Sequence, residues 1–117
     1  MSTRSVGDAA ERLAAKFLED HFAYKILTRN YRSRFGEVDI IAEEAGVLCF
    51  VEVRMRTTSR YGEAIETVSV EKRRRIARTA RQFLVVNNME DRACRFDMVT
   101  LQDGGNPVLL RDAFYAD

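Results

Sequence analysis

The sequence predicts an α/β domain in which a mixed central β-sheet is flanked by helices. Three observations predict this class: two segments have the apolar spacing of amphipathic helices, five have the composition of strands, and their order is α-β-β-β-α-β-β. The chain has 117 residues, of which 46% are hydrophobic. This is the size and composition of one compact domain, which we expect to span residues 1–117.

The first predicted helix covers residues 7–22, where apolar side chains recur at helical spacing. Asp8 is a candidate N-cap, and Glu11 follows three residues later, as in a capping box. A strand-like mixture of aromatic and β-branched residues then covers residues 24–32, and a stronger strand covers residues 37–43. These segments provide one helix and the first two strands.

The next strand, residues 47–54, is apolar at both alternating positions until Glu52, the pattern of a central strand covered on both faces. Residues 55–69 have little periodicity and predict a long loop, which we expect to contact the substrate. The second helix begins near Ser69, a good N-cap, and runs to about Val86. Two further strands complete the sheet at residues 95–101 and 108–111.

Charge is distributed unevenly along the chain. Nineteen Lys and Arg against eighteen Asp and Glu give a net charge of +1, which excludes the uniformly basic surface of a histone-like protein. From Arg54 to Arg81, however, nine basic residues are accompanied by only three glutamates. Any nucleic-acid contact is therefore expected in this basic segment.

Other sequence features narrow the class of protein. The longest apolar run, residues 47–51, is too short to cross a bilayer, and the N-terminal residues contain no apolar signal segment. No glycine-rich phosphate loop is present. Cys49 and Cys94 lie in apolar or strand-like surroundings and predict buried, reduced thiols. We expect a soluble cytoplasmic protein without an organic cofactor.

Two neighbouring strands end their apolar runs with carboxylates. If the two-residue turn Ala45-Gly46 joins these strands, Asp39 lies directly opposite Glu52, with Cβ atoms about 4.5 to 5.5 Å apart. A four-residue loop would instead oppose Glu37 and Glu52, and a three-residue loop would place the carboxylates on opposite faces. Carboxylates near a core require a partner. Two oxygen ligands at this spacing suit Mg²⁺, or Mn²⁺ in its place.

A cation held in this way is suited to phosphodiester hydrolysis, because it polarises the scissile phosphate and lowers the pKa of an attacking water. The basic segment after Glu52 then predicts where a polyanion binds. At helical spacing, Lys72 projects towards the core at the start of the second helix, whereas three arginines of that helix lie on the opposite side. The expected nucleic-acid-binding residues are Arg56, Arg60, Arg74, Arg78 and Arg81.

Three segments of the chain resemble a known family, together with a basic helix that begins near Lys72. The segments are Gly36-Glu37-Val38-Asp39-Ile40-Ile41-Ala42, Phe50-Val51-Glu52-Val53-Arg54-Met55-Arg56 and Arg95-Phe96-Asp97-Met98-Val99. Nearly the whole chain resembles the YraN-like bacterial proteins, uncharacterised protein family 0102. That family is similar to the restriction-endonuclease-like superfamily, whose PD-(D/E)xK motif binds Mg²⁺, and in particular to archaeal Holliday-junction resolvases.

The resemblance implies a restriction-endonuclease-like fold in which Asp39 and Glu52 are the metal-binding acids. It implies that Glu11 is an additional acid, contributed by the first helix. It also favours a homodimer, since two sites related by a two-fold axis would cut paired strands. Arg54 occupies the position at which the motif has lysine.

Because arginine stands at the lysine position, two residues are candidates for the catalytic cation. Lysine approaches a nucleophilic water as a compact charge with a tunable pKa, whereas arginine stays protonated and binds phosphate as a planar fork. Either Arg54 stabilises the transition state without proton transfer, or Lys72 supplies the ammonium. The sequence predicts a metal-dependent nuclease acting on unpaired or branched DNA. The alternatives are a catalytically inactive nucleic-acid-binding module on the same fold, and a protein-interaction domain whose acidic pair is structural.

Overall fold

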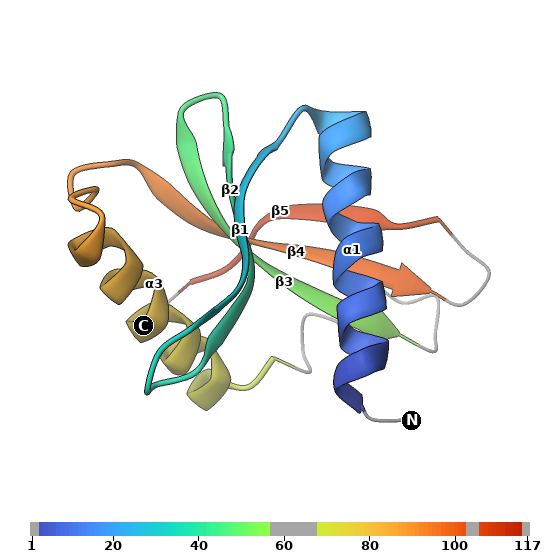
Figure 1. The fold of residues 1–117 in the computed structure, drawn as a ribbon, viewed down its shortest axis with the longest axis horizontal. Helices are drawn as coiled ribbons and strands as arrows, with labels where there is room; N and C mark the ends of the chain where they lie inside the picture. Colours follow the sequence, from blue (N-terminus) through green and yellow to red (C-terminus); the bar gives the residue numbers. More distant parts are fainter. Residues whose placement is uncertain (1–2, 57–67, 103–105, 116–117) are drawn as a thin grey trace.

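The expected order of elements is confirmed in the computed structural model, which describes residues 3–56, 68–102 and 106–115 (Figure 1). The elements are α1 (Thr3–Phe22), β1 (Lys25–Arg32), β2 (Glu37–Glu44), β3 (Val47–Arg56), α3 (Val70–Val86), β4 (Cys94–Gln102) and β5 (Val108–Phe114). The five strands form one sheet in the order β1-β2-β3-β4-β5. Strands β3 and β4 are parallel and the other neighbours are antiparallel, so the sheet is mixed.

Strand β3 lies at the centre of the sheet and is covered on both faces. Leu48 and Phe50 belong to the apolar cluster that α3 closes, and Cys49 and Val51 belong to the cluster that α1 closes. All four residues are fully buried. The absence of polar alternation in this segment therefore predicted its central position correctly, because each face of the strand packs against a different helix.

The N-terminus of α1 differs from the prediction. The helix begins at Thr3 and not near residue 7, so Asp8 lies inside the helix and is not its N-cap. Gly7 does not stop the helix, since an interior glycine costs only about 1 kcal/mol relative to alanine. The capping-box interpretation of Glu11 is therefore wrong, and Glu11 is a buried residue of the helix interior.

Helix α3 begins as predicted. Ser69 is its N-cap and accepts a hydrogen bond from the backbone N–H of Lys72 at 3.0 Å. This cap fixes the first turn of α3, and with it the position of Lys72. The predicted loop 55–69 is shorter at its start, because β3 continues to Arg56, and residues 57–67 of that loop lie outside the described residues.

Two further expectations concern the cysteines and a membrane. Cys49 is buried as expected, but Cys94 is exposed, because it is the first residue of β4 and lies at the end of the sheet. Within the described ranges, no helix combines the length and apolar character needed to span a bilayer.

Candidate metal and nucleic-acid site

The register of β2 and β3 brings the two predicted carboxylates together. Glu44 is paired with Val47, so the connection is the two-residue turn, and its residues Ala45 and Gly46 have φ values of 50° and 83°. Such positive φ values match the turns that best fit the twist of a hairpin. The described ladder ends at Ile40 and Val51, and the next residues along the two strands are Asp39 and Glu52.

Where the ladder ends, side chains replace the missing backbone pairing. The Asp39 carboxylate accepts a hydrogen bond from the backbone N–H of Val53 at 2.8 Å. A cavity of about 170 Å³ opens here between the sheet and α3. Its lining residues are Gly36, Glu37, Asp39, Glu52, Lys72, Arg75 and Ile76.

Gly36 allows α3 to approach this end of the sheet closely. A Cβ atom at Gly36 would lie 3.3 Å from the Cβ of Arg75, closer than ordinary van der Waals contact. The missing side chain therefore lets the first turns of α3 reach the strand that carries Asp39.

A third carboxylate reaches the same place from α1. Carboxylate oxygens of Glu11, Glu37 and Asp39 all lie within 4.8 Å of one another. Glu11 is 8% exposed, and its Oε1 atom has no hydrogen-bond partner among the described residues. An unsatisfied buried carboxylate oxygen is costly, and a hard cation such as Mg²⁺ is a partner that satisfies it. The donor set thus fits a divalent cation.

Glu37 is a further acid at this end of β2, although the register does not place it opposite Glu52. It contacts Arg32 at 3.4 Å, but it also belongs to the carboxylate triad and lines the cavity. The sequence contained a usable signal, because residues two apart on a strand point to the same face and Glu37 precedes Asp39 by two.

Without a bound cation, the environment of the cluster disfavours the ionised form of two of its carboxylates. The pKa of Asp39 is raised from 3.8 to about 9. Burial is the largest cause, and the adjacent charge of Glu52 and a hydrogen bond with Glu52 contribute to the same shift. Burial also raises the pKa of Glu11 above its usual range. A bound divalent cation would reverse this effect, because its charge favours the ionised carboxylates.

These shifts predict that the metal-free protein loses stability as pH rises. Folded Asp39 retains its proton between pH 3.8 and about 9, whereas the unfolded chain has lost it. The folded state binds more protons in this window, so the free energy of unfolding falls with increasing pH. Thermal unfolding in a chelator should show this decline for the wild type and a flatter profile for Asp39→Asn. Parallel profiles for the two proteins would contradict the assignment.

Two cationic side chains, one from α3 and one from β3, lie close to the Glu52 carboxylate. Lys72 Nζ lies 2.6 Å from Glu52 Oε2, and Arg54 NH1 lies 3.7 Å from the same oxygen. The expectation that Lys72 projects towards the core is confirmed. Because Glu52 is only 4% exposed, its charge depends on these partners.

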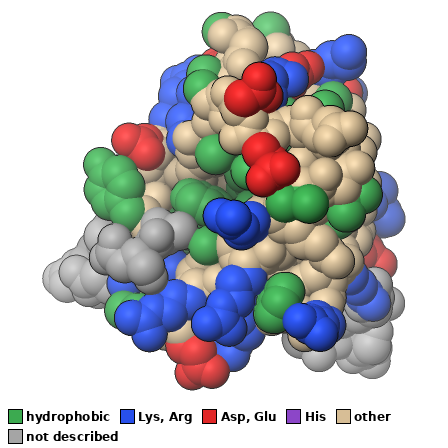
Figure 2. All heavy atoms as spheres, turned by 90° about the vertical axis from the view of Figure 1, so that its left-hand side faces the viewer, with side chains coloured by type: hydrophobic (Ala, Val, Ile, Leu, Met, Phe, Trp, Pro, Cys, Tyr) green, Lys and Arg blue, Asp and Glu red, His purple; other side chains and the backbone are tan. Residues whose placement is uncertain are grey.

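Two of the predicted DNA-contacting arginines of α3, Arg78 and Arg81, line a second cavity and not the one that the carboxylates line. Arg74, Arg78 and Arg81 are exposed, as predicted, and Figure 2 shows Lys and Arg side chains gathered over the lower half of this face. Arg75, which is not among the expected nucleic-acid-binding residues, lines the carboxylate cavity and pairs with Glu71 at 2.8 Å. Two predicted contacts are not tested: the Arg56 side chain and the whole of Arg60 lie outside the described residues.

Another buried carboxylate provides a comparison. Asp97 accepts hydrogen bonds from Tyr24 Oη at 2.7 Å, from Arg95 Nε at 2.9 Å and from the backbone N–H of Asp112 at 2.9 Å. Its oxygens are satisfied within the protein, as expected for a structural acid. The contrast with Glu11 marks the Glu11–Glu37–Asp39 cluster as the site with unfilled ligand capacity.

The fold and site define an α/β protein with a partly buried carboxylate cluster where the pairing of two strands of a mixed sheet ends. A family model described as "Uncharacterised protein family UPF0102" matches residues 10–101. The UPF0102 protein of Symbiobacterium thermophilum is 43% identical over 97% of this chain and 99% of its own length. That of Nitrosospira multiformis is 41% identical over 97% and 96%, respectively. The chain belongs to the UPF0102 family.

Proposed function

We propose that this protein is a metal-dependent nuclease of the cytoplasm that hydrolyses phosphodiester bonds in DNA with unpaired or branched structure. One observation carries the proposal: Glu11, Asp39, Glu52 and Lys72 converge from two strands and two helices at one end of the sheet, beside the arginines of α3. Acids, an ammonium and a basic wall are the groups that phosphodiester hydrolysis requires. The resemblance of the sequence to restriction-endonuclease-like proteins supports the same reaction.

Each group has a proposed role. Glu11, Glu37 and Asp39, with Glu52 beside Asp39, would hold Mg²⁺ or Mn²⁺. The bound cation would polarise the scissile phosphate and lower the pKa of the attacking water. Lys72 holds the Glu52 carboxylate in position through their ion pair, and presents an ammonium group to the phosphate. Arg75 extends the positive charge along the cavity wall.

Charge reversal on α3 tests DNA binding separately from cleavage. The variant Arg74→Glu with Arg78→Glu should bind DNA on the order of 100-fold more weakly, and its binding should depend less steeply on salt, by about two units of log–log slope. Fluorescence anisotropy across a salt series measures both quantities. The matched control is Arg12→Glu with Lys16→Glu, which makes the same change of charge at exposed positions of α1 and should bind normally.

Glu52→Ala then separates the nuclease from a catalytically inactive binding module. For the nuclease we expect this variant to retain DNA but to lose cleavage in Mg²⁺. Glu52→Ala that cleaves as fast as the wild type would contradict the proposed site. A wild type that binds DNA but cleaves no structured DNA in Mg²⁺ or Mn²⁺ would support the binding module instead.

A further inference from the structure

The turn that joins β1 to β2 is fixed to helix α3. Ser33 Oγ and Thr79 Oγ1 share a hydrogen bond of 2.8 Å, although the residues are 46 positions apart. The backbone N–H of Phe35 donates to Ser33 Oγ at 3.0 Å, and the N–H of Ser33 donates to the carbonyl of Gly36 at 2.9 Å. These bonds fix the turn to the buried face of α3, because Thr79 is fully buried.

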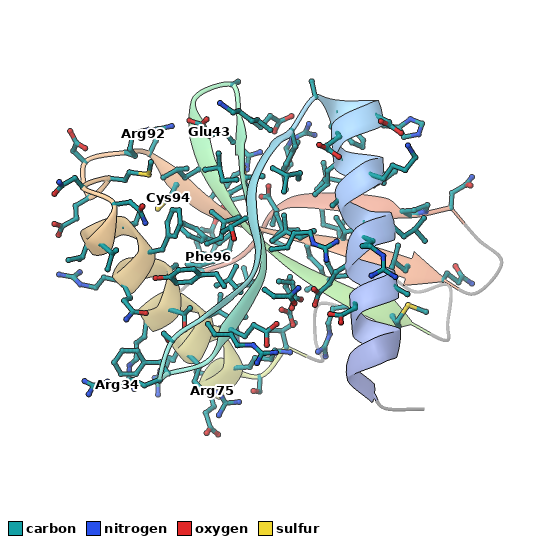
Figure 3. All side chains as sticks on the ribbon, in the orientation of Figure 1. Arg34, Glu43, Arg75, Arg92, Cys94 and Phe96 are labelled. Atoms are coloured by element: carbon teal, nitrogen blue, oxygen red, sulfur yellow. The ribbon has the colours of Figure 1, made fainter. Side chains whose placement is uncertain are left out.

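Phe35 is the aromatic residue of this turn, and two guanidinium groups flank it. The Cζ atoms of Arg34 and Arg78 lie 4.9 and 5.8 Å from the centre of its ring. Figure 3 shows Arg34 and Arg75 at the same end of the molecule, beside the first half of α3. The surface thus combines an aromatic ring with cations from two elements.

Core packing does not explain Phe35. The ring belongs to neither of the two apolar clusters formed by the described residues, although it is half-buried. Tyr31, four residues earlier, packs edge-on against Phe83 with ring centroids 5.2 Å apart and is part of one cluster. Tyr31 therefore belongs to the core of the protein, whereas Phe35 does not.

Phe35 is also adjacent to the carboxylate cavity. The next residue, Gly36, lines that cavity, and consecutive Cα atoms are about 3.8 Å apart. Arg75 lines the cavity from α3, one helical turn before Arg78. The backbone of Phe35 therefore adjoins a residue that lines the carboxylate cavity, and Arg78, which contacts its ring, lies one turn after the cavity-lining Arg75.

We propose that Phe35, between Arg34 and Arg78, stacks on an unpaired nucleobase beside the scissile phosphate. This inference rests on the proposed function and narrows it to DNA whose strand is unpaired at the point of cleavage. Aromatic rings and guanidinium planes bind unstacked bases, whereas the bases of a continuous duplex already stack on one another. Phe35 is thereby a specificity-determining residue, because the arginines alone attract any phosphate backbone.

The test compares two DNA probes with three substitutions. Fluorescence anisotropy in a chelator, which prevents cleavage, measures the affinity for a fork with two unpaired arms and for a fully paired duplex of the same length. Phe35→Leu removes the ring and keeps an apolar side chain, and Phe35→Tyr keeps the ring. The matched control is Phe22→Leu, since Phe22 is another half-buried phenylalanine with a guanidinium, that of Arg111, 5.1 Å from its ring centre.

We expect the wild type to prefer the fork. Phe35→Leu should bind the fork at least about fivefold more weakly, the lower limit for loss of one stacked base, and should bind the duplex as before. Phe35→Tyr and Phe22→Leu should retain the preference. Equal loss on fork and duplex, or unchanged fork binding by Phe35→Leu, would overturn the inference.

Failure of the inference and failure of the proposed function give different results. A wild type that cleaves DNA but binds fork and duplex equally overturns the stacking role alone. A wild type whose fork preference depends on Phe35 but which cleaves no DNA in Mg²⁺ or Mn²⁺ supports the stacking role and contradicts the nuclease. Binding of neither probe by the wild type overturns both.

Discussion

Replacing Asp39 with asparagine is expected to abolish divalent-cation binding and to lower the rate of DNA cleavage by well over 100-fold. The loss should exceed the roughly 10- to 100-fold that is typical when a group supporting a metal ligand is removed, because Asp39 itself belongs to the carboxylate triad and adjoins Glu52. Calorimetric titration with Mn²⁺, and with Mg²⁺ in parallel, measures the binding directly. It needs no knowledge of the natural DNA substrate.

The substitution should not unfold the protein. Asparagine has nearly the same shape as aspartate, and its amide oxygen can still accept the hydrogen bond from the Val53 N–H. Asparagine is also neutral without taking up a proton, so the metal-free variant avoids the cost of protonating Asp39 on folding and should be at least as stable as the wild type at pH 8.

A carboxylate at the other end of β2 provides the control. Glu44 is bound by Arg95 and Arg111, which lower its pKa to about 2. Glu44→Gln should therefore leave cation binding unchanged, because this carboxylate already has its cationic partners. Equal Mn²⁺ affinity in Asp39→Asn and the wild type would show that the carboxylate cluster is not the metal site.

The parts of the site that the sequence predicted are those set by local pattern. The apolar run before Glu52 located the central strand, but the sequence left turns of two, three and four residues open, and the structure selects the two-residue turn Ala45-Gly46. Once this register is known, the position of Asp39 follows, because the alternation of side chains along paired strands leaves no freedom. The N-cap Ser69 similarly located the start of α3, and with it the position of Lys72 in the first turn.

The parts that the sequence did not predict depend on contacts between distant elements. The local pattern favoured a capping role for Glu11, and only the family resemblance implied an additional acid, because no local signal shows that α1 begins at Thr3 and passes the end of β2. The docking of Phe35 likewise depends on the hydrogen bond between Ser33 and Thr79. Such pairings arise from tertiary packing, which overrides local propensity and is invisible to periodicity.

Lys72→Gln is expected to slow DNA cleavage by about 100-fold or more, and Arg54→Gln is expected to slow it less. The Lys72 ammonium lies 2.6 Å from Glu52, whereas the Arg54 guanidinium lies 3.7 Å from it. A positioned group that moves a proton or stabilises charge contributes about 10²- to 10⁴-fold in rate. Single-turnover cleavage of a fork with unpaired arms measures both effects. Normal cleavage by Lys72→Gln would show that Lys72 is not the catalytic cation and would favour Arg54 in that role.

Stability separates a catalytic loss from simple unfolding. Lys72 is 37% exposed, so solvent screens its attraction to Glu52, and its removal should lower the free energy of unfolding by only about 1 kcal/mol. Thermal unfolding of Lys72→Gln and Arg54→Gln therefore provides the baseline. A cleavage loss of 100-fold with such a small change in stability cannot come from a smaller folded population.

Lys72→Arg then distinguishes the two roles that a cation can have here. If the ammonium only stabilises negative charge, arginine restores most of the rate, because its guanidinium also binds phosphate. If Lys72 must transfer a proton, arginine restores little, since it stays protonated at every accessible pH. We expect the first result, because Lys72 forms a close ion pair with Glu52, an arrangement that a guanidinium can also make. A cleavage rate of Lys72→Arg as low as that of Lys72→Gln would assign the proton transfer to Lys72 instead.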